Sequence, residues 1–406
     1  MAQHPFLKSI RPVNLLSFGP NTEEIELRPL NILIGPNGSG KSNFIEVLGL
    51  LKELPDKDPW STVLETGGVD EWIWKGLIQT APRALPSAIG VTFSPLKDGQ
   101  PLSFYELRVI KNPATYSFNV VSEKLGQIDP ATGGHDPFFV NRTEASPDSA
   151  YMRSEASSYA VSKAELLDVR LSILAQLVDV FHYPELYYFE QKLSKISLYR
   201  DWIFGVDANP RDTQPAGLES TRVAEDTRNL AHVLKAWRDR GDQSVFDQLV
   251  LLLRKFYEPV KDVDVEVLGN SLRILVKEEG LSSRTPATRL SDGTLRWLML
   301  LIVLLDPAPP PIICIEEPEL GLHPDMIPTL ADLLRDASTR TQLILTTHSQ
   351  SLVECFSDDP ESVCVCEKVD GATRIQRLDK DRLSSWLEDY TLGQLWAKGE
   401  IGGNRW

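Results

Sequence analysis

No stretch of this sequence is apolar for long enough to span a lipid bilayer. The longest apolar run extends from Trp297 to Leu305, whereas a transmembrane helix needs about 20 apolar residues. The N-terminus, Met1 to Lys8, also lacks the basic segment and apolar core of a secretory signal peptide. These two absences exclude a complete membrane transporter and predict a cytoplasmic protein without a membrane partner.

Cysteine, heptad repeats and positive charge are scarce as well. The four cysteines show no zinc-ligand spacing, which predicts reduced core thiols. No long heptad pattern is present, so a cohesin-like coiled-coil arm is excluded. With a net charge of −15, the surface as a whole disfavours nonspecific DNA binding, although a local basic groove stays compatible with that charge.

What the sequence does contain is a phosphate-binding loop. The segment from Gly35 to Ser42, GPNGSGKS, fits the pattern G-x-x-x-x-G-K-[ST] without a mismatch. An apolar run from Leu30 to Ile34 precedes it as a predicted buried strand, and apolar residues at helical spacing follow it from Asn43 to Leu51. This order of strand, loop and helix disfavours the alternative of an ordinary glycine-rich turn.

The residue types of this P-loop predict how it holds a nucleotide. Its glycines allow backbone N–H groups to face phosphate oxygens, and the start of the helix adds partial positive charge. Lys41 is predicted to reach the β- and γ-phosphates of ATP, and Ser42 to hold Mg²⁺.

A second set of polar residues follows predicted strands near the C-terminus. The apolar strand Ile312–Ile315 leads into Glu316 and Glu317, and the strand that begins at Gln342 leads to His348. In open α/β sheets, ligands bind beyond the carboxyl ends of the strands. Glu316 is therefore predicted to hold Mg²⁺, Glu317 to orient or deprotonate the attacking water, and His348 to bind the γ-phosphate. A purely structural strand-end histidine is the alternative for His348.

Five motifs in a fixed order carry a resemblance to a known family. They are GPNGSGKSN at 35–43, LSDGTLR at 290–296, IEEPE at 315–319, GLHP at 321–324 and TTHS at 346–349. In this combination the sequence resembles the head of ABC-type AAA ATPases. It is most similar to the RecF/SMC-like group and to the ATPase part of the overcoming-lysogenization-defect nucleases. The resemblance implies an α/β P-loop NTPase fold with a central, mostly parallel sheet, an antiparallel β subdomain and a helical insertion.

The resemblance also implies that two subunits enclose two ATP molecules. Each ATP would lie on the P-loop of one subunit and under the signature segment of the other, with Ser291 and the Gly293 backbone on its γ-phosphate. Glu319 to Pro324 would match the segment where the subunits cross, and His348 the switch histidine. The predicted site residues are Glu317 and His348 for catalysis, Asn37, Gly38, Ser39, Gly40, Lys41, Ser42, Asn43, Ser291 and Gly293 for the nucleotide, and Ser42 and Glu316 for the metal.

Three features depart from the family pattern. Glu316 stands where many ABC proteins have aspartate, and its longer side chain would move the metal slightly. Asp292 stands where transporters usually have glycine. The glutamine that usually joins the metal site is not identifiable, and Gln191 is only a weak candidate for it.

We expect four parts along the chain. Residues 1–125 form the N-terminal part of the head with the P-loop, and 126–261 a mainly helical insertion. Residues 262–366 form the C-terminal part of the head, and 367–406 a tail. The patterns predict a turn and short strand at 67–76, strands at 89–93, 103–110 and 115–121, a loop at 126–147, helices at 155–186, 226–237 and 244–257, and a hairpin at 262–277.

The expected function is ATP binding and hydrolysis that gates a separately encoded effector. Too little chain follows His348 for a Toprim nuclease domain, so no nuclease activity is expected here. Stand-alone heads of this kind resemble components of anti-phage defence, which implies a second copy of the chain and a nuclease or toxin as partners. The alternatives are a RecF-like repair or recombination ATPase that clamps DNA, and an ATP-switched scaffold with little turnover.

The tail carries an apolar, aromatic face that has two interpretations. It packs on its own head or it meets a partner, and packing on the head is favoured. Its residues are Trp386, Leu387, Tyr390, Leu395 and Trp396.

Overall fold

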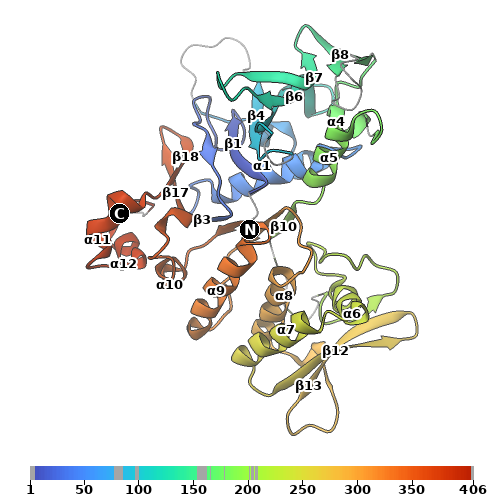
Figure 1. Cartoon of the computed structure of the whole chain (residues 1–406), viewed down its shortest axis with the longest axis vertical. Coiled ribbons are helices and arrows are strands. Elements are labelled where there is room, and N and C mark those ends of the chain that lie inside the picture. The colour runs from blue at the N-terminus through green and yellow to red at the C-terminus, as the bar shows by residue number, and fades with distance from the viewer. Residues whose placement is uncertain are drawn as a thin grey trace. The chain divides into compact units, whose positions relative to one another are not determined.

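The chain forms two compact units in the computed structural model, which describes residues 5–76, 86–96, 100–152, 162–164, 166–177, 179–200, 202, 205 and 209–403. The first unit takes in Met1–Ile196, Asp359–Glu388 and Leu395–Trp406. The second takes in Ser197–Asp358 and Asp389–Gln394. Figure 1 shows the elements of both.

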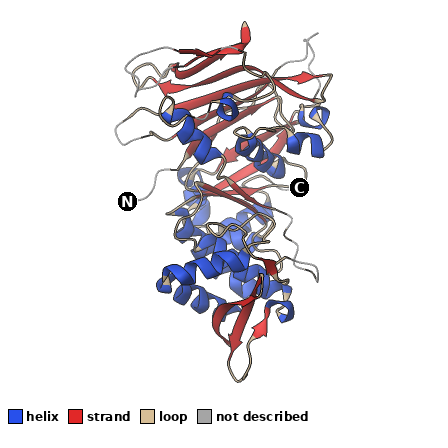
Figure 2. Ribbon diagram, turned by 90° about the vertical axis from the view of Figure 1, so that its right-hand side faces the viewer, coloured by secondary structure: helices blue, strands red, loops and turns tan. Residues whose placement is uncertain are grey.

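An antiparallel sheet of eight strands dominates the first unit, and its long strands are drawn in red in Figure 2. Its strands alternate between buried and more exposed positions, as in β5, where Tyr105, Leu107 and Val109 are buried and Arg108 and Ile110 are exposed. In spatial order the strands are β2 (Ile25–Glu26), β1 (Leu7–Val13), β4 (Ser87–Phe93), β5 (Ser103–Asn112), β6 (Ser117–Ile128), β7 (His135–Thr143), β8 (Ser146–Met152) and β9 (Ser162–Ala164).

The P-loop of this unit lies between a buried strand and a helix. Strand β3 (Leu30–Ile34) is buried at every residue and pairs in parallel with β17 (Val363–Val369), which in turn pairs antiparallel with β18 (Ala372–Arg377). Helix α1 (Lys41–Glu53) buries apolar residues at helical spacing. The unit also holds α2 (Ser61–Glu65), α3 (Val69–Trp72), α4 (Ile173–Gln176), α5 (Pro184–Leu193) and α11 (Lys380–Leu387).

The second unit combines three short parallel strands with helices and a hairpin. Strand β15 (Ile312–Glu316) pairs in parallel with both β10 (Ser197–Tyr199) and β16 (Gln342–Thr346). Helix α8 (Asp292–Leu304) buries nearly every residue after its first turn. The remaining elements are α6 (Leu230–Arg240), α7 (Gln243–Phe256), α9 (Ile327–Ser338), α10 (Gln350–Glu354), β11 (Gln214–Pro215), β12 (Val260–Leu268), β13 (Ser271–Glu278) and β14 (Thr285–Pro286).

The expectation of a mostly parallel central sheet is wrong. The sheets are mostly antiparallel, and among the pairs whose register is described the parallel ones are β3 with β17, β10 with β15, and β15 with β16. The predicted antiparallel subdomain is confirmed and is larger than expected. Parallel neighbours need a long crossover connection, whereas antiparallel neighbours can be joined by a short turn. Strands β5 to β8 follow one another through short turns in residues 113–145, and each turn therefore adds an antiparallel strand to the sheet.

Two other expectations fail in the same region. The predicted loop at 126–147 contains β7 and most of its hairpin with β8, because its turn residues are gathered in a short turn in which Gly133 N donates to Asp129 O at 2.8 Å. In the predicted helical stretch at 155–186 the described residues hold β9, α4 and the start of α5, while 153–161, 165 and 178 lie outside the described residues. At 67–76 a short helix, α3, replaces the expected strand.

The other predicted elements are confirmed. They include β3 and α1 around the P-loop, α6 and α7, the hairpin of β12 and β13, and α8 with β15 and β16. The four-part division of the chain stays a prediction. In the described residues of 126–261, strands β7 to β11 accompany helices α4 to α7.

Three of the four cysteines are buried, and Cys355 is half-buried. All four are free thiols, and burial raises the pKa of the Cys364 thiol. No helix within the described ranges has both the length and the apolar character needed to cross a membrane.

The apolar face of the tail is partly buried and partly exposed. Helix α12 (Leu392–Lys398) buries Leu395 and Trp396, and the Trp396 indole donates to Gly403 O at 3.3 Å. Trp386 and Tyr390 stay exposed. The second half of the face therefore packs on the protein, as expected, and the last three residues, 404–406, lie outside the described residues.

Candidate nucleotide-binding site

The P-loop has a backbone conformation that only glycine accommodates. Gly35, Gly38 and Gly40 have φ angles of 150°, 78° and 105°, in a region that other residues rarely adopt. A Cβ atom on Gly35 would lie 2.2 Å from the carbonyl oxygen of Cys366, and one on Gly40 would lie 2.1 Å from the hydroxyl of Thr373. Gly35 and Gly40 therefore let Cys366 and Thr373 pack closely against the loop, whereas Gly38 is favoured by its φ angle alone, because a Cβ atom there would meet nothing within 4 Å.

Lys41 lies inside this loop. Its side chain is buried, and Nζ donates to Gly35 O at 2.8 Å and to Pro36 O at 3.2 Å. The ammonium group thus meets carbonyl oxygens of the loop where the sequence predicts phosphate oxygens. Asn37, Gly38 and Ser42 are exposed, and Ser39 and Gly40 are buried.

Strand β18 supports the loop from behind. The Thr373 hydroxyl lies 2.8 Å from Ser39 O and 2.7 Å from the Ser17 hydroxyl. Both partners are buried, so these contacts fix the loop's shape independently of any ligand. The protein groups present fit a phosphate-binding site, since the loop supplies oriented backbone N–H groups, a buried cation and a helix start.

The two predicted acids follow strand β15. Glu316 is its last residue, and Arg200, which follows β10, has its Nε 3.7 Å from Glu316 Oε1. Glu317 has a φ angle of 46°, which is uncommon for a residue other than glycine. Its backbone N donates to Thr346 O at 3.0 Å. Backbone strain of this kind, typically about 1–3 kcal/mol, clusters at functional sites.

His348 lies beside Glu317 at the end of the neighbouring strand. Its Nε2 is 3.9 Å from Glu317 Oε1, and both side chains are 40% exposed. Its backbone N donates to Glu319 Oε1 at 3.3 Å, and the Thr347 hydroxyl donates to the same oxygen. Burial raises the pKa of Glu319, while these two hydrogen bonds oppose the shift. Glu319 therefore braces the turn that presents His348.

The signature segment begins helix α8. The Ser291 hydroxyl accepts a hydrogen bond from Thr294 N at 3.1 Å and caps the helix. Ser291 and Asp292 are exposed. A Cβ atom on Gly293 would lie 3.0 Å from the Phe256 ring and 3.1 Å from Gly321 O, so glycine lets the helix start approach the segment at 319–324.

The structure thus brings the predicted residues together in two groups, each within one unit. The first unit presents the P-loop residues, and the second presents the acids with His348 and the signature residues. The roles of these residues stay predictions. The weak candidate Gln191 lies in α5, where its side chain donates to Glu190 at 2.8 Å.

Sequence reasoning missed three arginines that contact predicted site segments. Arg200 contacts Glu316, Arg211 contacts Asp292, and Arg296 donates to Leu320 O. Arg200 follows a strand of only three residues, which leaves no periodic pattern to find. Arg296 could have been identified from the sequence, because it belongs to the signature motif itself.

The residues predicted for Mg²⁺ do not form a closed protein cage. Throughout the described part of the chain, no cluster of three or more His, Cys, Asp or Glu side chains is arranged to hold a metal ion. Mg²⁺ usually binds through one or two protein groups together with substrate phosphates and water. Ser42 and Glu316 belong to different units of the chain, so their joint role as metal ligands stays a prediction.

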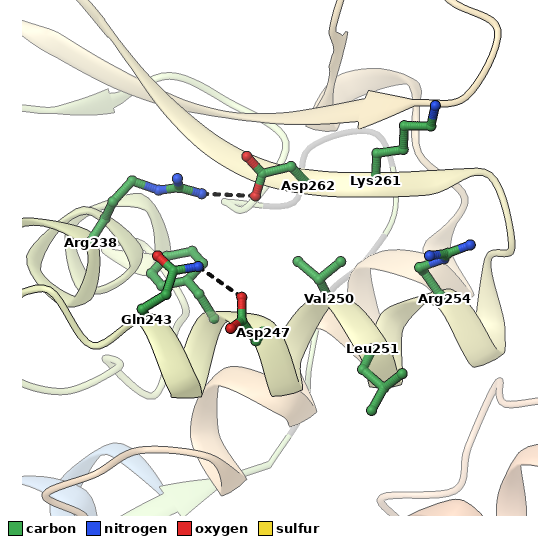
Figure 3. A pocket seen from close by; sticks show the side chains of 9 residues that line it. Arg238, Gln243, Asp247, Val250, Leu251, Arg254, Lys261 and Asp262 are labelled. Atoms are coloured by element: carbon green, nitrogen blue, oxygen red, sulfur yellow. Dashed lines mark hydrogen bonds and ion pairs between the residues drawn. The ribbon is translucent and has the colours of Figure 1, made fainter.

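A surface pocket of about 430 Å³ lies among α6, α7 and β12 (Figure 3). None of the residues that line it is a predicted site residue. Its polar groups largely pair with one another. Arg238 donates to Asp262 at 2.9 Å, and Gln243 donates to Asp247 at 2.8 Å. The pocket therefore offers no arrangement for phosphate like that of the P-loop.

Comparisons with known proteins place the fold and the family. A family model described as "AAA domain, putative AbiEii toxin, Type IV TA system" matches residues 30–354, most of the chain. No curated protein matches the sequence.

Similar solved structures are head domains of Smc proteins. An SmcHead bound to the C-winged helix domain of ScpA is 14% identical, with a TM-score of 0.58 over 93% of this chain and 99% of that one. An Smc head domain with an extended coiled coil, bound to the C-terminal domain of ScpA and derived from Pyrococcus furiosus, is 14% identical, with a TM-score of 0.52 over 95% and 99%. At these identities the likeness establishes the shared head fold alone.

Proposed function

The chain belongs to the AAA family of AbiEii-like domains, and on this premise we propose that it binds and hydrolyses ATP as a dimer that gates a separately encoded effector. The observation that carries the proposal is the P-loop, in which three glycines have positive φ angles and a buried Lys41 lies within the loop. Within the family, the proposal assigns the chain to the RecF/SMC-like and overcoming-lysogenization-defect group, because of the order of its five motifs.

The proposed chemistry assigns one task to each residue of the site. Lys41 exchanges its two carbonyl partners for phosphate oxygens, and the loop N–H groups bind the rest of the triphosphate. Bound Mg²⁺, held by Ser42 and Glu316, would supply positive charge that offsets charge developing on the phosphates. Glu317 orients the attacking water and accepts its proton, and His348, which lies 3.9 Å from Glu317, donates to the γ-phosphate.

Closure of the site requires a second subunit in this proposal. Ser291 is exposed at the start of α8, and the backbone N–H groups there form an anion-binding helix terminus. We assign this terminus to the γ-phosphate held by the P-loop of the partner copy. The single-chain structure supports the assignment through the exposure of Ser291 and Asp292.

A protein partner and a defence role complete the proposal. The family description names a type IV toxin–antitoxin system, and an SmcHead of this fold is bound to a domain of ScpA. Both observations support a head that acts through another protein, here an effector such as a nuclease or toxin. We include in the proposal a role in anti-phage defence in the cytoplasm.

The Ser291→Arg variant tests the subunit sandwich. The long cationic side chain is expected to block the approach of two heads, so ATP should no longer produce dimers and turnover should fall about tenfold or more. Light scattering after size-exclusion chromatography, with and without ATP and Mg²⁺, measures the mass. A variant that hydrolyses ATP at the normal rate as a monomer would refute the head-to-head arrangement.

The Lys41→Ala variant tests the nucleotide site itself. Loss of the ammonium group removes hydrogen bonds to charged phosphates, each worth about 1.5–3 kcal/mol, so the ATP dissociation constant should rise about 10- to 100-fold. Calorimetric titration with ATP measures it, and Lys52→Ala, at the far end of the same helix, is the matched control. Wild-type affinity in Lys41→Ala would remove the P-loop from the proposal.

The DNA-clamp alternative has its own test. Gel-shift binding of duplex DNA that requires ATP and is lost in Lys41→Ala would favour a RecF-like clamp over a protein effector. With a net charge of −15, we expect no such shift at physiological salt.

A further inference from the structure

The guanidinium group of Arg211 bonds to the signature segment and to the turn before it. It lies in the irregular stretch between β10 and β11, and its side chain is only 10% exposed. Nη2 pairs with the Asp292 carboxylate, and Nε donates to Gly205 O at 3.1 Å. Nη1 donates to three backbone carbonyls, those of Leu290 at 2.7 Å and of Ala287 and Thr288 at 3.4 Å.

These contacts fix the backbone immediately before the helix. Ala287 to Arg289 form a single 3-10 turn, and Leu290 then extends toward Ser291. A guanidinium group has donors in a rigid planar fork, so it can hold several carbonyls and a carboxylate at once, which a lysine ammonium cannot do in the same geometry. The turn is thereby held in place from a segment about 80 residues away in the chain.

Asp292 creates an electrostatic difficulty at this helix start. A helix N-terminus carries roughly half a positive elementary charge, which favours an anion. The Asp292 carboxylate, in the first turn of α8, carries a full negative charge and is 64% exposed. By itself it would outweigh the terminus and repel a phosphate. The positive charge of Arg211 cancels it and leaves the terminus net positive.

We propose that Arg211 is a positioning residue for the signature segment, which neutralises Asp292 and holds the backbone before Ser291 so that the helix start accepts the γ-phosphate bound to the partner subunit. This inference rests on the proposed ATP sandwich. It gives a role to Arg211, which belongs to no motif of the sequence. It also accounts for an acid at the signature position where transporters have glycine.

A double-mutant cycle separates this role from a merely structural one. The full-length chain is titrated with ATP in Mg²⁺, and the ATP concentration that gives half-maximal dimer is measured by light scattering. Arg211→Met should raise this concentration about tenfold or more, because Asp292 is left unpaired at the anion site. Asp292→Asn should stay within about twofold of wild type, and the double variant should recover most of the loss.

Two further measurements keep the cycle interpretable. Arg228→Met removes an exposed arginine that pairs with Asp226 in the same unit, and it should leave dimerisation unchanged. The thermal midpoint of each variant shows whether it is folded. If Arg211→Met lowers that midpoint, Arg211→Lys, which keeps the charge but not the fork, should give a smaller loss of dimer than Arg211→Met.

Recovery of dimerisation in the double variant supports the inference. Wild-type dimerisation by Arg211→Met overturns the inference alone, and a double variant as weak as Arg211→Met overturns the neutralisation of Asp292 as the main role of Arg211. A wild-type chain that stays monomeric at every ATP concentration overturns the proposed sandwich, and this inference with it.

Discussion

Replacement of Glu317 by glutamine is expected to lower the ATP turnover number by about 10²- to 10⁴-fold, the usual contribution of a general base. Glutamine keeps the size and hydrogen-bonding ability of the side chain but cannot accept the proton of the attacking water. The orientation of residue 317 comes from its backbone, through the φ angle of 46° and the hydrogen bond from its N to Thr346 O. The substitution should therefore leave the geometry in place.

ATP binding should be retained in this variant, because the substitution leaves Lys41 and the rest of the P-loop unchanged. The variant is expected to accumulate as a nucleotide-bound dimer, because dimers form but no longer dissociate through hydrolysis. Phosphate release at saturating ATP measures turnover, and light scattering measures the dimer. Glu279→Gln is the matched control, since Glu279 is an exposed acid of the same unit that pairs with Lys261 at 3.2 Å. Normal turnover by Glu317→Gln would remove Glu317 as the base.

The P-loop was predictable because its information is local. Strand β3, the three glycines and helix α1 are consecutive in the sequence, and each has a pattern that depends only on its neighbours. The same holds for Ser291, whose hydroxyl caps helix α8 by accepting a hydrogen bond from the backbone N of Thr294, three residues later. Local hydrogen bonds of this kind are encoded in spacing, so a motif is sufficient to find them.

The arginines of the site could not be found in that way. Arg211 bonds to residues 79 and 81 positions away, and Arg200 meets Glu316 only because β10 pairs in parallel with β15. Three-residue strands have no measurable period, so neither pairing nor contact follows from the sequence pattern. The missed strands β7 and β8 have a different cause: Asp129 to Gly134 has the composition of a loop but forms one tight turn.

A buried ion pair that the sequence patterns also did not predict is expected to contribute strongly to the stability of the first unit. Glu123 on β6 and Arg142 on β7 have side chains with no exposed surface, and Arg142 Nη1 lies 3.6 Å from Glu123 Oε2. Burial raises the pKa of the Glu123 carboxyl and lowers the pKa of the Arg142 guanidinium, and each partner's charge opposes the shift of the other. The pair persists because further hydrogen bonds satisfy both groups.

Those hydrogen bonds attach an irregular segment to the antiparallel sheet. Glu123 accepts from the Tyr105 hydroxyl at 2.8 Å, the Ser172 hydroxyl at 2.6 Å and Ile173 N at 2.9 Å, at the start of α4. Arg142 donates to Leu171 O at 2.9 Å and to Asp168 O at 3.2 Å. Removing either charge would leave the other buried without its partner.

The Arg142→Met variant is therefore expected to lose about 3–5 kcal/mol of unfolding free energy, the cost of breaking a buried ion pair from one side. The shift of the urea midpoint measures it. Arg170→Met is the control: Arg170 is 61% exposed and pairs with Asp168, so its loss should cost about 0–1 kcal/mol. Glu123→Gln added to Arg142→Met should recover part of the loss, because no buried charge then remains. A double variant less stable than Arg142→Met would show that the hydrogen bonds of Glu123, rather than its charge, hold this segment on the sheet.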